Sequence, residues 1–103
     1  MTDFVPVGHA TDFPEGAGRM VVVGSRHVAV FRLGDELHAL DNMCLHRGGP
    51  LCDGDVQGGV VTCPWHGWSF DIRSGTMVQD PRTGVSRHDV RVENGEVSVR
   101  LTD

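Results

Sequence analysis

The sequence has no tyrosine, two tryptophans, four phenylalanines and only three cysteines among its 103 residues. With so few aromatic side chains and with 14 glycines, the chain suits a small, loop-rich β domain better than a helical one. No long segment repeats its apolar residues at the helical period of 3.6, so we expect little helix. The length allows one domain with a modest core of its own. The expected fold class is therefore all-β.

Basic residues are too few for a nucleic-acid partner. Lysine and arginine together number 9 against 14 aspartates and glutamates, which gives a formal net charge of −5. Nucleic-acid binding calls for a basic patch or stripe, so we expect no such partner. The acidic balance also serves plain solubility.

Membrane and substrate-binding signals are missing as well. No stretch approaches the length needed to cross a bilayer, and the start, residues 1–4, lacks the basic and apolar regions of a signal peptide. There is no dinucleotide fingerprint, no phosphate loop, and no two-histidine, one-carboxylate motif of a non-haem iron enzyme. We therefore expect a soluble cytoplasmic protein with no contact to a membrane and no catalytic residue of its own.

Two of the three cysteines stand beside histidines. The first motif, residues 44–50, reads CLHRGGP and has the spacing C-x-H. The second motif, residues 63–71, reads CPWHGWSFD and begins C-x-x-H. Thiolates select zinc, copper(I) or iron–sulfur clusters, and imidazole suits zinc and iron. The candidate metal ligands are Cys44, His46, Cys63 and His66.

The arrangement of these ligands decides between two kinds of metal centre. A zinc finger usually opens C-x2-4-C and closes H-x3-5-H, so each half presents two like ligands. Here each motif presents one cysteine and one histidine. In a Rieske 2Fe–2S cluster, two histidines replace two cysteines on one of the two irons. Two loops that each give one ligand of each kind supply this set if they approach from opposite sides. The spacing thus favours a cluster, and a zinc-stabilised structural or binding domain is the alternative.

The two motifs in this order resemble the Rieske iron–sulfur family, and the resemblance covers most of the chain. It implies a Rieske 2Fe–2S cluster bound by Cys44, His46, Cys63 and His66. It also implies an antiparallel β fold, sandwich or barrel-like, with a small cluster-binding subdomain over roughly residues 41–71 of a single domain, 1–103. A cluster with no open coordination position moves single electrons, so the expected role is electron transfer without catalysis.

At four positions the sequence resembles the low-potential branch of that family. High-potential Rieske proteins of cytochrome bc complexes carry a serine and a tyrosine after the second histidine, where this chain has Trp68 and Phe70. They also have a disulfide at positions that match Gly49 and Trp65. Hydrogen bonds to the sulfurs raise the potential. Without these hydroxyls we expect a potential in the lower half of the Rieske range, roughly −150 to +300 mV.

The low-potential branch offers two functional interpretations. One is a monomeric ferredoxin that carries an electron from an NAD(P)H-dependent flavin reductase, the ferredoxin reductase, to a terminal oxygenase. The other is the small subunit of an assimilatory NAD(P)H nitrite reductase, to which the CPWHGW form of the second motif fits at least as well. Stable copurification would distinguish the subunit from the ferredoxin.

The remaining sequence predicts strands joined by tight turns. A short apolar segment with a proline, residues 4–7, is typical of an edge strand. In the last hairpin the turn Asn94-Gly95 sets Val92 opposite Val97 and Val90 opposite Val99, so that one face is apolar. The other strands are expected over residues 19–23, 27–33, 36–40, 55–57 and 60–62.

Several residues near the motifs have ordinary interpretations. Cys52 has no partner in the sequence and is expected to be a small, half-buried side chain. Asp71 is expected to be a turn carboxylate, and Pro81 resembles the proline of the third loop that covers the cluster in the Rieske family. The other four histidines are expected to be surface or strand residues with no redox role: His9, His27, His38 and His88.

Overall fold

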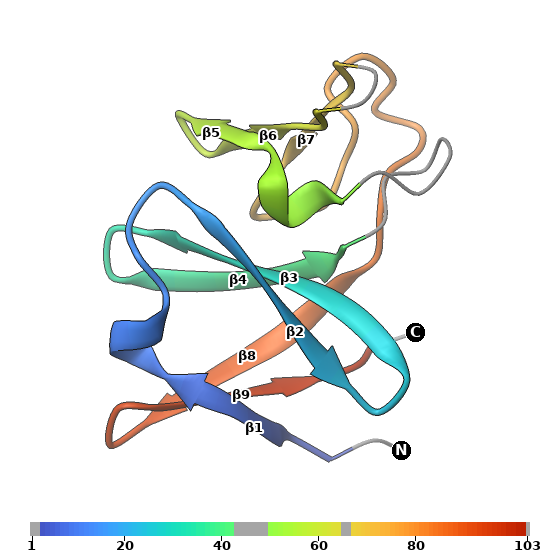
Figure 1. The fold of residues 1–103 in the computed structure, drawn as a ribbon. Coiled ribbons are helices and arrows are strands. Elements are labelled where there is room, and N and C mark those ends of the chain that lie inside the picture. Colours follow the sequence, from blue (N-terminus) through green and yellow to red (C-terminus); the bar gives the residue numbers. More distant parts are fainter. Residues whose placement is uncertain (1–2, 43–49, 65–66, 103) are drawn as a thin grey trace.

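The protein forms two antiparallel β-sheets, one stacked above the other (Figure 1). The structure is a computed structural model that describes residues 3–42, 50–64 and 67–102. The large sheet has the strand order β1-β9-β8-β4-β3-β2, and the small sheet has the order β5-β6-β7. The strands are β1 (Val5–His9), β2 (Gly18–Val23), β3 (Arg26–Leu33), β4 (Glu36–Asp41), β5 (Asp55–Gln57), β6 (Val60–Thr62), β7 (Ser69–Asp71), β8 (Arg87–Glu93) and β9 (Glu96–Arg100).

The described residues contain no α-helix. Two short 3-10 helices, η1 (Ala10–Asp12) and η2 (Leu51–Asp53), are the only helical turns in those parts of the chain. No helix in the described ranges is long and apolar enough to span a membrane. The all-β expectation is confirmed, and β1 is indeed an edge strand of the large sheet.

Tight turns set the register of the hairpins, as the sequence predicts. Gly58 and Gly59 both have positive φ, at 59° and 78°, and join β5 to β6. Asn94 and Gly95, with φ of 52° and 81°, join β8 to β9. Positive φ at both central residues is the geometry of the type I′ turn, whose twist matches that of the flanking strands.

The β8–β9 hairpin has the predicted register, but its apolar face is only partly buried. Val90 pairs with Val99 and Val92 pairs with Val97. Val92 is 47% exposed, whereas Ser98, on the opposite face, is only 5% exposed. The reason is that β9 has a strand on each side, β1 and β8. In contrast, β8 pairs with β4 only at the first two residues of β8, Arg87 and His88. The far half of β8 therefore extends past the strands that would cover it.

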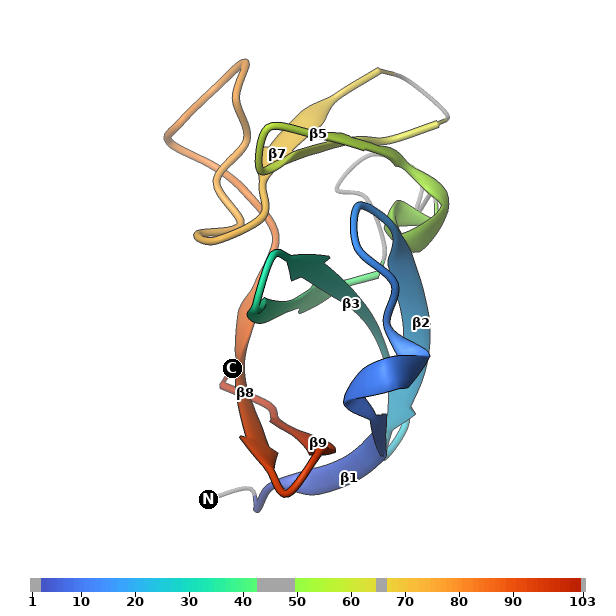
Figure 2. The ribbon, with the colours of Figure 1, turned by 90° about the vertical axis from the view of Figure 1, so that its left-hand side faces the viewer.

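The large sheet curls until its two edge strands approach each other, which makes a nearly closed barrel (Figure 2). Side chains of β2 and β3 tie the segment that follows β1 to the barrel wall. Arg32 donates from Nε to the carbonyl of Phe13 at 2.6 Å and from Nη2 to that of Ala10 at 2.6 Å. Arg19 donates to the carbonyl of Asp12 at 2.9 Å. The barrel interior is filled by Phe13, Val21, Val23, Val28, Val30, Ala39, Val97 and Val99.

A second core fixes the small sheet on the outer face of the barrel. Ala29, Phe31 and Leu40 project from β3 and β4 on the side away from the barrel interior. They pack against side chains of the small sheet and its neighbouring segments, namely Leu51, Val61, Cys63, Phe70, Ile72, Met77 and Val85. Because all of these are buried, the two sheets are held together mainly by apolar contact.

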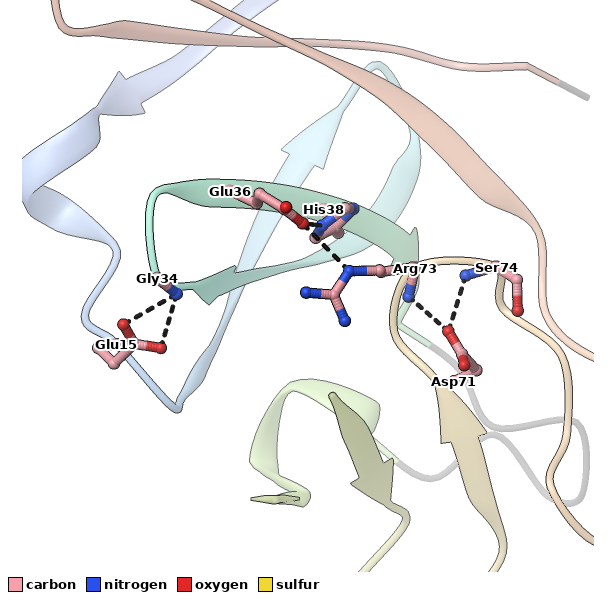
Figure 3. Close-up of polar contacts among 7 residues, drawn as sticks. All are labelled: Glu15, Gly34, Glu36, His38, Asp71, Arg73 and Ser74. Carbon is pink, nitrogen blue, oxygen red and sulfur yellow. Dashed lines mark hydrogen bonds and ion pairs between the residues drawn. The ribbon is translucent and has the colours of Figure 1, made fainter. Parts of the chain in front are cut away.

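An ion-pair cluster adds a polar tie between the sheets (Figure 3). Glu36 on β4 accepts hydrogen bonds from His38 at 2.8 Å and from Arg73, which follows β7, at 3.1 Å. These two bonds hold the pKa of the Glu36 carboxyl below its ordinary value. Asp71 accepts from the backbone N–H groups of Arg73 and Ser74, so it is the turn carboxylate that the sequence predicts. The cluster is exposed, so its contribution to stability is small.

Candidate metal centre

Cys63, one of the four candidate ligands, lies in the core that joins the two sheets. It follows β6 and is 1% exposed. Its backbone N–H donates to the carbonyl of Trp68 at 2.7 Å, and its carbonyl accepts from the N–H of Gly67 at 3.1 Å. Gly67 has a φ of 73°, which favours glycine. These bonds bring the two ends of the segment that carries the C-x-x-H motif together.

The other three candidate ligands, Cys44, His46 and His66, lie outside the described residues. Gly49 and Trp65 also lie outside them. Within the described ranges, no group of three or more histidine, cysteine, aspartate or glutamate side chains is placed to hold a metal ion. The described residues on either side of the first motif nevertheless show how its two ends are held.

Asn42 joins the two ends of the first motif. It is 7% exposed, and its N–H donates to the carbonyl of His27 at 3.0 Å. Its own carbonyl accepts from the N–H of Leu51 at 2.6 Å, and its side-chain Oδ1 accepts from the N–H of Cys52 at 2.8 Å. One buried residue thus ties the end of β4 to the start of η2. Asn42 was not predicted from the sequence. A signal was present, because two polar residues, Asp41 and Asn42, end an apolar strand just before the first motif.

A partly buried network fixes Asp41, the residue before Asn42. Asp41 accepts from Arg26 at 2.8 and 3.0 Å, and its Oδ1 lies 2.8 Å from Nε2 of His88. Nδ1 of His88 accepts from the N–H of Thr102 at 3.3 Å, so the ring proton is assigned to Nε2. His88 is 1% exposed, so it is a buried strand residue. The network links three strands and the C-terminal segment at the root of the first motif.

The segment of residues 72–86 lies against the second motif. The N–H of Val78 donates to the carbonyl of Ser69 at 2.7 Å, and the side chain of Gln79 bonds to backbone in the same region. Asp80 pairs with Arg82, whose side-chain and backbone hydrogen bonds lower the pKa of the Asp80 carboxyl. Pro81, between them, is exposed. That Pro81 belongs to a loop that covers the cluster, as the resemblance implies, stays a prediction.

Cys52 is half-buried in η2, as the sequence predicts, and it forms no disulfide. Burial, with a further contribution from the neighbouring Asp53 carboxylate, raises the pKa of the Cys52 thiol. A raised pKa makes the reactive thiolate form less abundant near neutral pH. Cys52 therefore contributes to the site through its backbone N–H, which donates a hydrogen bond to Oδ1 of Asn42.

Comparison with known proteins identifies the family. A model of the Rieske [2Fe-2S] domain matches residues 3–96. The chain belongs to the Rieske family. The cofactor of this Rieske protein is accordingly a 2Fe–2S cluster, and the zinc site considered as an alternative is not supported.

The relatives of this Rieske protein include ferredoxin components of oxygenase systems. It is 35% identical over 102 residues to the anthranilate 1,2-dioxygenase ferredoxin subunit of Burkholderia cepacia, covering 98% of this chain and 94% of that protein. A chain in the complex of reduced oxygenase and oxidised ferredoxin in carbazole 1,9a-dioxygenase is 33% identical, with a TM-score of 0.85, over 94% of this chain and 92% of that one. A protein assigned as the NADH-dependent nitrite reductase small subunit of Mycobacterium tuberculosis is 25% identical, with a TM-score of 0.88, over 100% and 98% of the chains.

The described residues of this Rieske protein fit such a cluster. The thiol of Cys63 is free and is withdrawn from water at the end of a strand. It is surrounded by apolar side chains of the core, Val61 and Phe70 among them. Thiolates are the ligands that iron–sulfur clusters require, and burial of a cluster limits solvent access to it. When bound, the cluster accepts and releases one electron.

Replacing Asn42 by leucine is expected to weaken the hold on the Rieske cluster. Leucine matches the size of asparagine but has no oxygen for the N–H of Cys52, which is left unsatisfied at a cost of about 1–3 kcal/mol. The Asn42→Asp variant keeps an acceptor and should retain the cluster. Iron content as purified, together with the half-life of the visible absorbance in the presence of a chelator, measures the effect. Equal half-lives for the wild type and Asn42→Leu would show that Asn42 does not hold the motif.

Proposed function

We propose that this protein is the ferredoxin of a multicomponent oxygenase, accepting one electron from an NAD(P)H-dependent flavin reductase and passing it to a terminal oxygenase. The observation that carries the proposal is the end-to-end similarity to the ferredoxin subunit of anthranilate 1,2-dioxygenase. The similarity to a chain of an oxygenase–ferredoxin complex supports it further. In this proposal the whole chain, 1–103, is one Rieske domain that works as a cytoplasmic monomer, with its cluster-binding part over roughly residues 41–71. It transfers electrons and catalyses no reaction itself.

The proposed ligands are Cys44 and Cys63 on one iron, and His46 and His66 on the other. Two ferric ions, two sulfides and two thiolates sum to zero charge, so reduction produces an anion of charge −1. A four-cysteine cluster is already anionic before it is reduced. A cluster held by these four residues would therefore accept an electron more readily, and the imidazoles of His46 and His66 would offer that electron a route to a docked partner.

The proposal predicts a potential in the lower half of the Rieske range. Trp68 is half-buried against the core and Phe70 is fully buried, and neither carries the hydroxyl that would stabilise the reduced cluster. A redox titration followed by EPR should give a midpoint well below about +100 mV, with two irons and two labile sulfides per chain. A midpoint above that value would contradict the assignment to the low-potential branch.

The nitrite reductase small subunit is the second candidate, because the chain also covers the whole length of such a protein at a TM-score of 0.88. The two functions differ in how long the protein stays bound to its partner. Expression with its native partners followed by gel filtration separates them. A ferredoxin elutes alone and is reoxidised by a terminal oxygenase in stopped-flow mixing. A subunit elutes in a stable complex with a larger flavoprotein and is not reoxidised by an oxygenase.

A further inference from the structure

The side chain of Gln79 lies across the backbone that follows the second motif's histidine. Its Oε1 accepts the N–H of Ser69 at 3.0 Å, and its Nε2 donates to the carbonyl of Gly67 at 3.3 Å. The neighbouring N–H of Val78 donates to the carbonyl of Ser69 at 2.7 Å. The 72–86 segment therefore holds the backbone on both sides of Trp68.

Glutamine is suited to this arrangement because its amide offers an acceptor and a donor at one end. Glutamate, of the same length, offers acceptors only, and methionine offers neither group in a strong form. Both ends of the Gln79 amide are satisfied by backbone atoms, and these belong to residues on either side of one aromatic side chain. A surface glutamine that only faced solvent would not show this pairing.

We propose that Gln79 is a positioning residue for the second ligand segment of the Rieske centre. It acts through the backbone of Gly67 and Ser69. By fixing the chain directly after His66, it sets how firmly that ligand is held and how the cluster is shielded. The inference rests on the ligand set given under the proposed function.

The test compares Gln79→Met and Gln79→Glu with Gln57→Met. Gln57 is a matched control, because it is an exposed glutamine at the end of β5 whose Nε2 donates to the Asp55 side chain at 3.2 Å, away from the second motif. Gln79→Met removes both bonds and should release the cluster to a chelator roughly fivefold faster than wild type. It should also shift the reduction potential and the g values of the reduced cluster. Gln79→Glu keeps only the bond to Ser69, so its rate of cluster release should lie between those of wild type and Gln79→Met. Gln57→Met should release the cluster at the wild-type rate.

A second measurement does not depend on the cluster. Amide hydrogen exchange of Ser69, followed by NMR in the metal-free protein, should be about fivefold faster in Gln79→Met than in wild type. Unchanged exchange at Ser69, or cluster release and potential equal to those of wild type, would overturn the role of Gln79. A wild-type protein that contains no 2Fe–2S cluster would instead overturn the proposed function, and the exchange measurement would still decide the role of Gln79.

Discussion

The Cys63→Ala variant is expected to fold and to contain no Rieske cluster. Cys63 is the one proposed ligand among the residues that the structure describes, and an iron–sulfur cluster needs its thiolate ligands. Alanine is apolar and smaller, so the core around Val61 and Phe70 should tolerate it. Iron and labile sulfide should fall to background, and the EPR signal of the reduced protein should vanish. Far-ultraviolet circular dichroism should still report β structure.

The remaining cysteine provides the control for that experiment. Cys52→Ala removes the half-buried thiol in η2 but keeps the backbone N–H that Asn42 accepts. It should bind two irons and show the EPR signal of the wild type. If Cys63→Ala also retained two irons with unchanged g values, the proposed ligand set would be wrong. If Cys52→Ala lost the cluster instead, Cys52 would replace Cys63 as a ligand candidate.

The Phe70→Ala variant is expected to lower the free energy of unfolding by about 3–5 kcal/mol. Phe70 on β7 is fully buried and packs in the core that attaches the small sheet to the outer face of the barrel. The barrel interior is a separate set of side chains, so it should keep most of its packing. We therefore expect the small sheet to lose order first and the cluster to dissociate readily. Denaturant unfolding of the metal-free protein measures the stability.

Phe13→Ala is the comparison for that variant. Phe13 is just as buried, at 2% exposure, but it belongs to the barrel interior. Its loss should destabilise the barrel by a similar amount. Amide exchange then distinguishes the two: Phe70→Ala should speed exchange in β5, β6 and β7 while β2 and β3 stay protected. Equal loss of protection in both sheets would show that the protein unfolds as a single unit and that the two cores are not separate.

The strands and turns could be predicted because their causes are local. Gly58-Gly59 and Asn94-Gly95 carry their turn geometry in two residues, and that geometry sets the register of the strands on either side. Burial in the last hairpin could not be predicted in the same way. Val92 is exposed and Ser98 is buried because of which strands lie beside β8 and β9, and this depends on contacts between distant parts of the chain.

The candidate site also has a part that could be predicted from the sequence, the ligands, and a part that could not, the residues that support them. Its proposed ligands stand in two short motifs whose spacing is visible in the sequence, so they could be named. Their supports are not grouped in this way: His88 lies 47 residues from Asp41, and Gln79 lies 10 residues from Ser69. Nothing in a lone histidine or glutamine shows that folding will place it against the root of a metal-binding segment.

The bond from Thr102 to His88 has a practical consequence for handling the protein. The C-terminal segment is one hydrogen bond from His88, which in turn contacts Asp41 just before the first motif. An affinity tag, fusion partner or electrode linker added after Thr102 would directly disturb the contacts from Thr102 to His88 and from His88 to Asp41. The N-terminal end leaves the barrel on the side away from the small sheet (Figure 1). Attachments made there should leave the redox centre undisturbed.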